Sequence, residues 1–158
     1  MTLRKYFPSA IITGAEINRR SLAMCRNHSI DDRIAFIYSE HTKIAQRGPF
    51  DAIFCMAVLQ RTPHRIVDQY ITNLRHIYPF EKFDRQVAEL DSLLKKGGLL
   101  TIYNTQYRFS DAGVASKYVA LESANHDLND GPKFGRNSER LHESAAATLG
   151  PIFVKMTV

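Results

Sequence analysis

One stretch of ten residues constrains the fold of this chain more than any other. Residues 50–59, FDAIFCMAVL, are apolar at every position except Asp51. A strand that is apolar on successive residues is typically buried on both faces, as in parallel sheets that are covered by helices. This stretch therefore predicts a buried parallel strand within an α/β fold.

Other short apolar segments occur along the chain, and helical patterns lie between them. Residues 19–28 favour a helix that follows Asn18, and apolar residues from Phe80 to Leu94 recur at helical spacing before a Lys-Lys-Gly-Gly stop. The alternation predicts a doubly wound, mostly parallel, Rossmann-like sheet with helices on both faces. Strands are predicted at residues 10–17, 33–38, 50–59 and 99–104, and residues 152–158 resemble a last strand.

Three segments are less regular. Residues 3–9 resemble the last turn of a helix that Pro8 closes, since proline cannot continue a helix. Residues 66–74 are predicted as a helix over a sheet edge, with a substrate-facing insertion as the alternative. A short helix is predicted around residues 114–123.

Length and composition indicate one globular domain. The chain has 158 residues, of which 44% are hydrophobic and 23% are charged, close to the averages of globular proteins. We predict a single domain over residues 1–158, with a core at 10–104 and a variable substrate-side region at 105–158.

Several classes of function are disfavoured. The net charge of +5 comes from scattered basic residues, so nucleic acid is not an expected partner. No apolar run approaches the roughly 20 residues that cross a bilayer, which favours no membrane association and a cytoplasmic location. Cys25 and Cys55 lack metal-binding spacing, and His142 with Glu139 has no second pair, so no metal site is expected.

Two acidic residues lie at the exits of predicted strands. In doubly wound folds, ligands bind beyond the carboxyl ends of the strands. Glu16 lies at the exit of the first predicted strand, where a carboxylate can accept ribose hydroxyls or simply cap the next helix. Glu40 follows the second strand, where it can accept an adenine amine or remain a solvated loop residue.

Four segments together resemble the class I S-adenosylmethionine-dependent methyltransferases. They are similar, in order, to regions around the family's second, third, fourth and fifth strands, over about the first two thirds of the chain. The segments are residues 14–26 (GAEINRRSLAMCR), 36–42 (FIYSEHT), 50–61 (FDAIFCMAVLQR) and 93–104 (LLKKGGLLTIYN).

The resemblance implies a cofactor and residues that bind it. S-adenosylmethionine would be held by Glu16 at the ribose and by Glu40 at the adenine amine, with Ile17 packed against the base. Cys55, Met56 and Ala57 would form the wall beside the methionine moiety, with buried strand core as the alternative for Cys55.

The chain departs from the family in one respect. The family's first strand and its glycine-rich cofactor loop have no counterpart, and Gly14 is the only glycine before Gly48. We expect either an N-terminally truncated reading frame or a homologue that has lost the loop, with impaired activity.

The expected chemistry asks little of individual side chains. Methyl transfer from a sulfonium to a small-molecule acceptor depends mainly on positioning and desolvation, so we assign no catalytic residue. The residues that follow the fourth and fifth strands are candidates for acceptor binding, with arginine suited to a carboxylate or phosphate. These candidates are Arg61, His64, Asn104, Tyr107 and Arg108.

Two other functions remain open. An acid after the second strand also suits the ribose of NAD, which would indicate an oxidoreductase. A noncatalytic remnant that binds a partner, or forms a homodimer through exposed sheet or apolar surface, is the third reading.

Overall fold

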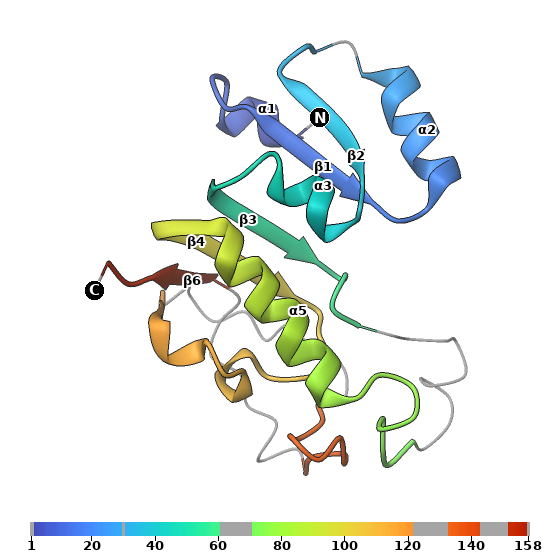
Figure 1. Cartoon of the computed structure of the whole chain (residues 1–158), viewed down its shortest axis with the longest axis vertical. Helices are drawn as coiled ribbons and strands as arrows, with labels where there is room; N and C mark the ends of the chain where they lie inside the picture. The colour runs from blue at the N-terminus through green and yellow to red at the C-terminus, as the bar shows by residue number, and fades with distance from the viewer. Residues whose placement is uncertain (1, 30, 61–70, 122–132, 143–151, 158) are drawn as a thin grey trace. The chain divides into compact units, whose positions relative to one another are not determined.

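The computed structural model describes residues 2–29, 31–60, 71–121, 133–142 and 152–157 (Figure 1). It divides the chain into two compact units, Met1–Gly48 and Pro49–Val158, and each is described here by itself. Both contain helices and strands, so the predicted mixed α/β class is confirmed. The prediction of one domain stays a prediction, because this division does not measure whether either unit folds alone.

The first unit is built on a parallel pair of strands. β1 pairs with β2 in a register that sets Gly14 opposite Phe36 and Glu16 opposite Tyr38. Asn18 caps α2, because its side-chain oxygen accepts hydrogen bonds from two backbone N–H groups of the first turn. The elements are α1 (Thr2–Tyr6), β1 (Ile12–Glu16), α2 (Arg19–His28), β2 (Ile34–Tyr38) and α3 (His41–Ala45).

Arg4 ties α1 to the rest of the first unit. Its Nε donates to Asp31 Oδ2 at 2.7 Å, and its Nη1 donates to the carbonyl oxygens of Phe7, Pro8 and Ala10. These bonds close the turn in which the predicted helix ends before Pro8.

The lack of a side chain at Gly14 leaves room for the ring of Phe36. An added Cβ at Gly14 would lie 2.7 Å from the ring of Phe36 on the neighbouring strand. The aromatic ring therefore occupies the space that a side chain at this position would need.

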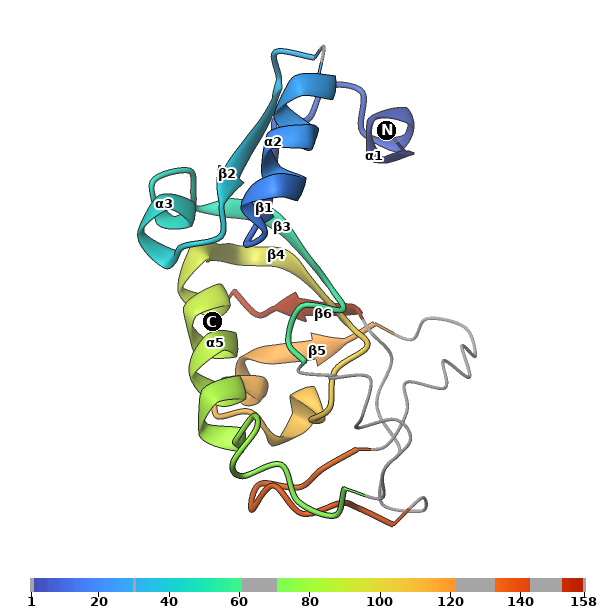
Figure 2. The same ribbon diagram turned by 90° about the vertical axis from the view of Figure 1, so that its right-hand side faces the viewer.

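The second unit contains a mixed sheet with strand order β3-β4-β6-β5 (Figure 2). β3 and β4 are parallel, whereas β6 runs antiparallel to both of its neighbours. This four-stranded sheet is therefore not mostly parallel as predicted. Its elements are β3 (Phe50–Met56), α5 (Phe80–Leu93), β4 (Leu94–Tyr103), the 3₁₀ turns η1 (Phe109–Asp111) and η2 (Ala115–Lys117), β5 (Tyr118–Ala120) and β6 (Ile152–Lys155).

Helix α5 covers one face of this sheet (Figure 1). Its apolar stripe, with Phe83 and Val87 at 0% exposure, packs in the main core with strand residues that include Leu100 and Phe153. The helical spacing in the sequence predicted this amphipathic helix, which ends at Leu93, just before the predicted stop at Lys95.

Boundaries around the sheet differ from the predictions. β4 begins at Leu94 rather than Leu99, because the predicted Lys-Lys-Gly-Gly turn forms an irregularity within the strand. Gly97 has a φ of +75°, a conformation that glycine adopts without strain. β3 ends at Met56 rather than Leu59, because Ala57 leaves the extended conformation with a φ of 54°.

The predicted helix at residues 114–123 is wrong over its described part, which ends at residue 121. Residues 115–117 form a 3₁₀ turn, and Tyr118–Ala120 form β5 against β6. Tyr118 is drawn into the core by its ring contacts, with its centroid 5.2 Å from that of Phe109. Packing of this aromatic side chain outweighs the weak local preference for helix.

The predicted helix at residues 66–74 lies partly outside the described residues. The described part, from residue 71, is not helical. Its backbone bonds instead to a distant segment, since Leu74 N–H donates to Ser138 O and Thr72 O accepts from Arg140 N–H. The predicted last strand is confirmed by β6.

Candidate functional site

The carboxyl edge of β1 and β2 carries both predicted cofactor acids. Glu16 is the last residue of β1 and pairs with Tyr38, the last residue of β2. Glu40 lies two residues beyond Tyr38. A backbone hydrogen bond from Ser39 N–H to Glu16 O joins the ends of the two strands. Ile17 follows Glu16 and is 63% exposed, so an apolar side chain faces solvent at the same edge.

Each acid already has one protein contact. Glu16 Oε1 accepts a hydrogen bond from Asn18 N–H at 2.7 Å, so the residue supports the turn into α2. Glu40 Oε2 lies 3.5 Å from Lys43 Nζ, one turn along the chain. A carboxylate can accept several hydrogen bonds, so these contacts are compatible with ligand binding.

Three further residues lie at this edge and were not among the predicted site residues. Tyr38 ends β2, and its ring lies beside the cationic groups of Arg19 and Lys43. The signal in the sequence was an aromatic residue at the end of a strand, with one basic residue in the helix before that strand and one in the helix after it.

In the second unit, β3 and β4 end side by side. Met56 pairs with Tyr103, and Ala57 N–H donates to Tyr103 O at 2.9 Å. The residues that follow, Ala57 and Asn104, both have a φ of 54°. Two neighbouring non-glycine residues in the left-handed region mark a sharp turn at each strand end, and such conformations are enriched at functional sites.

The three predicted wall residues of β3 do not share one environment. Cys55 is 6% exposed within the core, and burial raises the pKa of its thiol to about 11. The thiol is thus neutral at physiological pH and packs as an apolar group. Met56 and Ala57 are exposed, so they are the members of the trio that a ligand can contact.

Of the three predicted acceptor residues that the structure describes, two are engaged within the protein. Tyr107 is completely buried, and its hydroxyl donates to Tyr78 O at 2.6 Å and is hydrogen-bonded to Ser138 Oγ at 3.0 Å. Arg108 makes a two-point contact with Asp111, at 2.8 and 3.0 Å.

Asn104 is half-buried at the end of β4, and it remains a candidate for acceptor binding. Arg61 and His64 lie outside the described residues.

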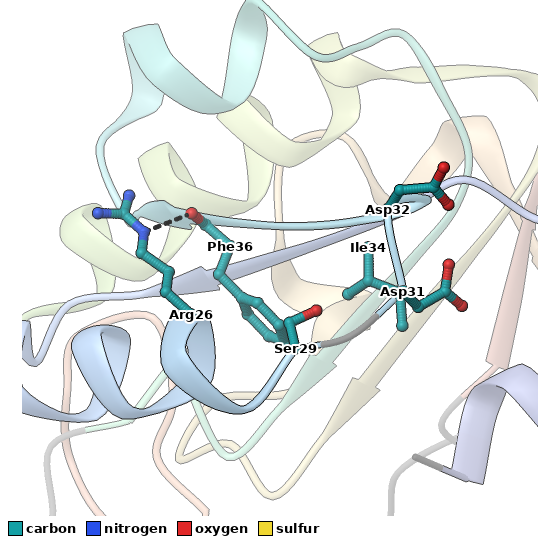
Figure 3. Close-up of a pocket in the computed structure, with 6 residues that line it drawn as sticks. All are labelled: Arg26, Ser29, Asp31, Asp32, Ile34 and Phe36. Atoms are coloured by element: carbon teal, nitrogen blue, oxygen red, sulfur yellow. Dashed lines mark hydrogen bonds between the residues drawn. The ribbon is translucent and has the colours of Figure 1, made fainter.

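A shallow hollow lies at the amino end of β2, away from the two acids (Figure 3). Arg26 Nε donates to Phe36 O, and Asp31 bonds to Arg4, so charged groups of the hollow stabilise the first unit. Ligands of doubly wound folds bind at the opposite, carboxyl edge. The hollow has a volume of about 420 Å³ and is lined by Arg26, Ser29, Asp31, Asp32, Ile34 and Phe36.

Comparison with protein-family models found no match, and a search of curated proteins also found none. Within the described part of the chain, no helix combines the length and apolar character needed to cross a membrane. Over the same residues, no three side chains of the types that bind metals gather into a possible metal site.

Proposed function

We propose that this chain is a methyltransferase-like domain that binds S-adenosylmethionine and acts on a small-molecule acceptor. The observation that carries the proposal is the placement of Glu16 and Glu40 at one carboxyl edge of a parallel strand pair. That edge is where ligands bind in doubly wound folds.

The residues at this edge fit the nucleoside half of the cofactor. Glu16 would accept hydrogen bonds from the ribose hydroxyls, and Glu40 would accept one from the adenine amine, since carboxylates are strong acceptors for such donors. The exposed side chain of Ile17 would pack against the base. The bound cofactor would supply an electrophilic methyl group, and the protein's part would be orientation and exclusion of water.

The strand order of the second unit also supports this proposal. This sheet resembles that of class I methyltransferases, in which the last strand is antiparallel and lies between two strands that precede it in the sequence. β6 has this position between β4 and β5. By the resemblance in sequence, Met56 and Ala57 would contact the methionine moiety. Asn104, which directly follows β4, would hydrogen-bond the acceptor.

Calorimetric titration of the chain with S-adenosylmethionine and with adenosine tests the proposal. We expect both to bind, and we expect Glu16→Ala to weaken each about ten-fold or more, because hydrogen bonds to a charged group contribute about 1.5–3 kcal/mol. Adenosine contains only the part of the cofactor that these acids would recognise. Binding of NAD in preference to both would favour the oxidoreductase alternative.

Glu81→Ala is the matched control, since it removes an exposed glutamate from α5 in the other unit. It should leave both affinities unchanged. Absence of binding by the unsubstituted chain, or equal weakening by the two substitutions, would contradict the proposal.

A second candidate function is self-association through the outer face of the four-stranded sheet. The face opposite α5 exposes apolar side chains from β3, β4 and β5, and Leu99 and Val119 both pair with Val154 of the intervening β6. Exposed apolar patches are typical of interaction surfaces. The exposed fractions are 47% for Phe54, 51% for Met56, 38% for Leu99 and 54% for Val119.

Light scattering after size exclusion tests this second candidate. We expect a dimer that Phe54→Lys converts to a monomer, because a lysine would place charge within the apolar contact. Phe7→Lys is the control, since Phe7 is 50% exposed in the first unit. A monomeric unsubstituted chain would overturn this candidate.

A further inference from the structure

The ring of Tyr38 contacts one cation from each of the two segments that follow β1 and β2. Arg19 Cζ lies 5.0 Å from the ring centroid, and Lys43 Nζ lies 5.7 Å from it. Both distances are within the range of cation–π attraction. Arg19 begins the helix that follows Glu16, and Lys43 lies in the helix that follows Glu40.

Lys43 also contacts Glu40. Its ammonium lies 3.5 Å from Glu40 Oε2, and both side chains are about half exposed, at 53% and 50%. An exposed ion pair of this kind contributes little by itself, because two flexible side chains lose rotamer freedom to form it. Contact with the Tyr38 ring already restricts the rotamers of Lys43, so less entropy is lost when Lys43 pairs with Glu40.

We propose that Tyr38 is a positioning residue for the adenosine-binding edge. Its ring orients Lys43, Lys43 orients the Glu40 carboxylate through Oε2, and Oε1 is directed to the ligand amine. Its contact with Arg19 links the same ring to the segment that begins at Glu16. This inference rests on the proposed function and adds a residue to it that does not itself touch the ligand.

The binding experiment uses the full chain with adenosine. Tyr38→Leu should weaken adenosine about two- to five-fold, which corresponds to the roughly 0.5–1 kcal/mol of an exposed cation–π contact. Tyr38→Phe retains the ring and should bind like the unsubstituted chain. Lys43→Ala should weaken binding similarly, and the double variant Tyr38→Leu/Lys43→Ala should be no weaker than either single variant.

A purely structural role for Tyr38 predicts a different result. The losses in the double variant would then add, because distant or independent effects are additive. Additive losses, or a Tyr38→Phe variant as weak as Tyr38→Leu, would overturn the proposal.

Nuclear magnetic resonance of the ligand-free chain separates this inference from the proposed function. The Lys43 ε-methylene protons should be shifted upfield by the ring, and the shift should vanish in Tyr38→Leu but remain in Tyr38→Phe. Adenosine binding without this shift would overturn the role of Tyr38 alone. A ring-dependent shift without binding of adenosine or S-adenosylmethionine would instead overturn the proposed function, and with it the assignment of Tyr38 to a ligand site.

Discussion

Asp91→Ala is expected to lower the free energy of unfolding of the second unit by about 3–5 kcal/mol, as for other buried ion pairs that lose one partner. Asp91 is 5% exposed on α5. Its carboxylate lies 2.7 Å from Lys117 Nζ and 2.9 Å from Lys155 Nζ, and it accepts a hydrogen bond from the Tyr118 hydroxyl. Alanine would leave the largely buried Lys155 ammonium without its countercharge.

The matched control is Asp84→Ala, on the same helix. Asp84 accepts one exposed hydrogen bond, from Gly113 N–H at 2.7 Å, so its loss should cost at most about 1.5–3 kcal/mol, less than the loss of Asp91. Urea denaturation followed by circular dichroism measures both variants. Equal destabilisation by the two substitutions would show that the buried ion pairs of Asp91 contribute no more to stability than one exposed hydrogen bond.

The same carboxylate predicts a pH dependence. Burial alone would raise the pKa of Asp91, but the hydrogen bonds from Lys117, Lys155 and Tyr118 prevail and hold it below the ordinary value of 3.8. A lowered folded-state pKa means that this stabilisation is fully present above the unfolded value and is lost as the pH falls through the folded value. Asp91→Asn should therefore flatten the fall in stability below about pH 4. An unchanged slope of unfolding free energy against pH in Asp91→Asn would show that Asp91 is not the source of this pH dependence.

Tyr107→Ala is expected to cost about 3–5 kcal/mol, the usual range for removing a buried aromatic side chain. The ring of Tyr107 lies in an aromatic cluster, with centroids 5.3 Å from Phe83, 5.4 Å from Phe80 and 6.4 Å from Phe134. Removing it would leave a cavity that these rings cannot fill without moving.

Tyr107→Phe isolates the hydroxyl and should cost about 1–3 kcal/mol, since a buried acceptor loses its donor. Because the hydroxyl is committed to Tyr78 O and Ser138 Oγ, the variant should leave adenosine affinity unchanged. Tyr103→Phe, at a half-buried tyrosine, is the control for stability. A loss of ligand affinity without a loss of stability would restore Tyr107 as a binding residue.

Local signals predicted most of the regular elements. Asn18 followed by a helix-favouring run predicted α2 and its cap, since the side-chain oxygen satisfies backbone donors only a few residues away. The apolar residues of α5 predicted its start at Phe80 and its buried face. The acids at strand ends were likewise predictable, because the apolar segments that contain β1 and β2 end within two residues of Glu16 and Glu40.

The roles of individual polar groups depended on distant partners. Tyr107 appeared available at a strand end, yet Ser138, 31 residues away, binds its hydroxyl. The ion pair of Arg108 and Asp111 depends on a local contact instead, because a spacing of three residues makes it predictable from the sequence. Tyr38 acquired its two cations only when two helices were brought to one strand end.

The sequence by itself determined the short-range features: where strands and helices form, how α2 is capped, and which face of α5 is buried. These depend on hydrogen bonds and apolar periodicity within a few residues. Only the tertiary structure decided that β6 inserts antiparallel between β4 and β5, since Leu99 pairs with Val154 across a long separation in sequence. It also decided that Asp91 gathers Lys117 and Lys155, because long-range strand pairing and core packing bring these groups together.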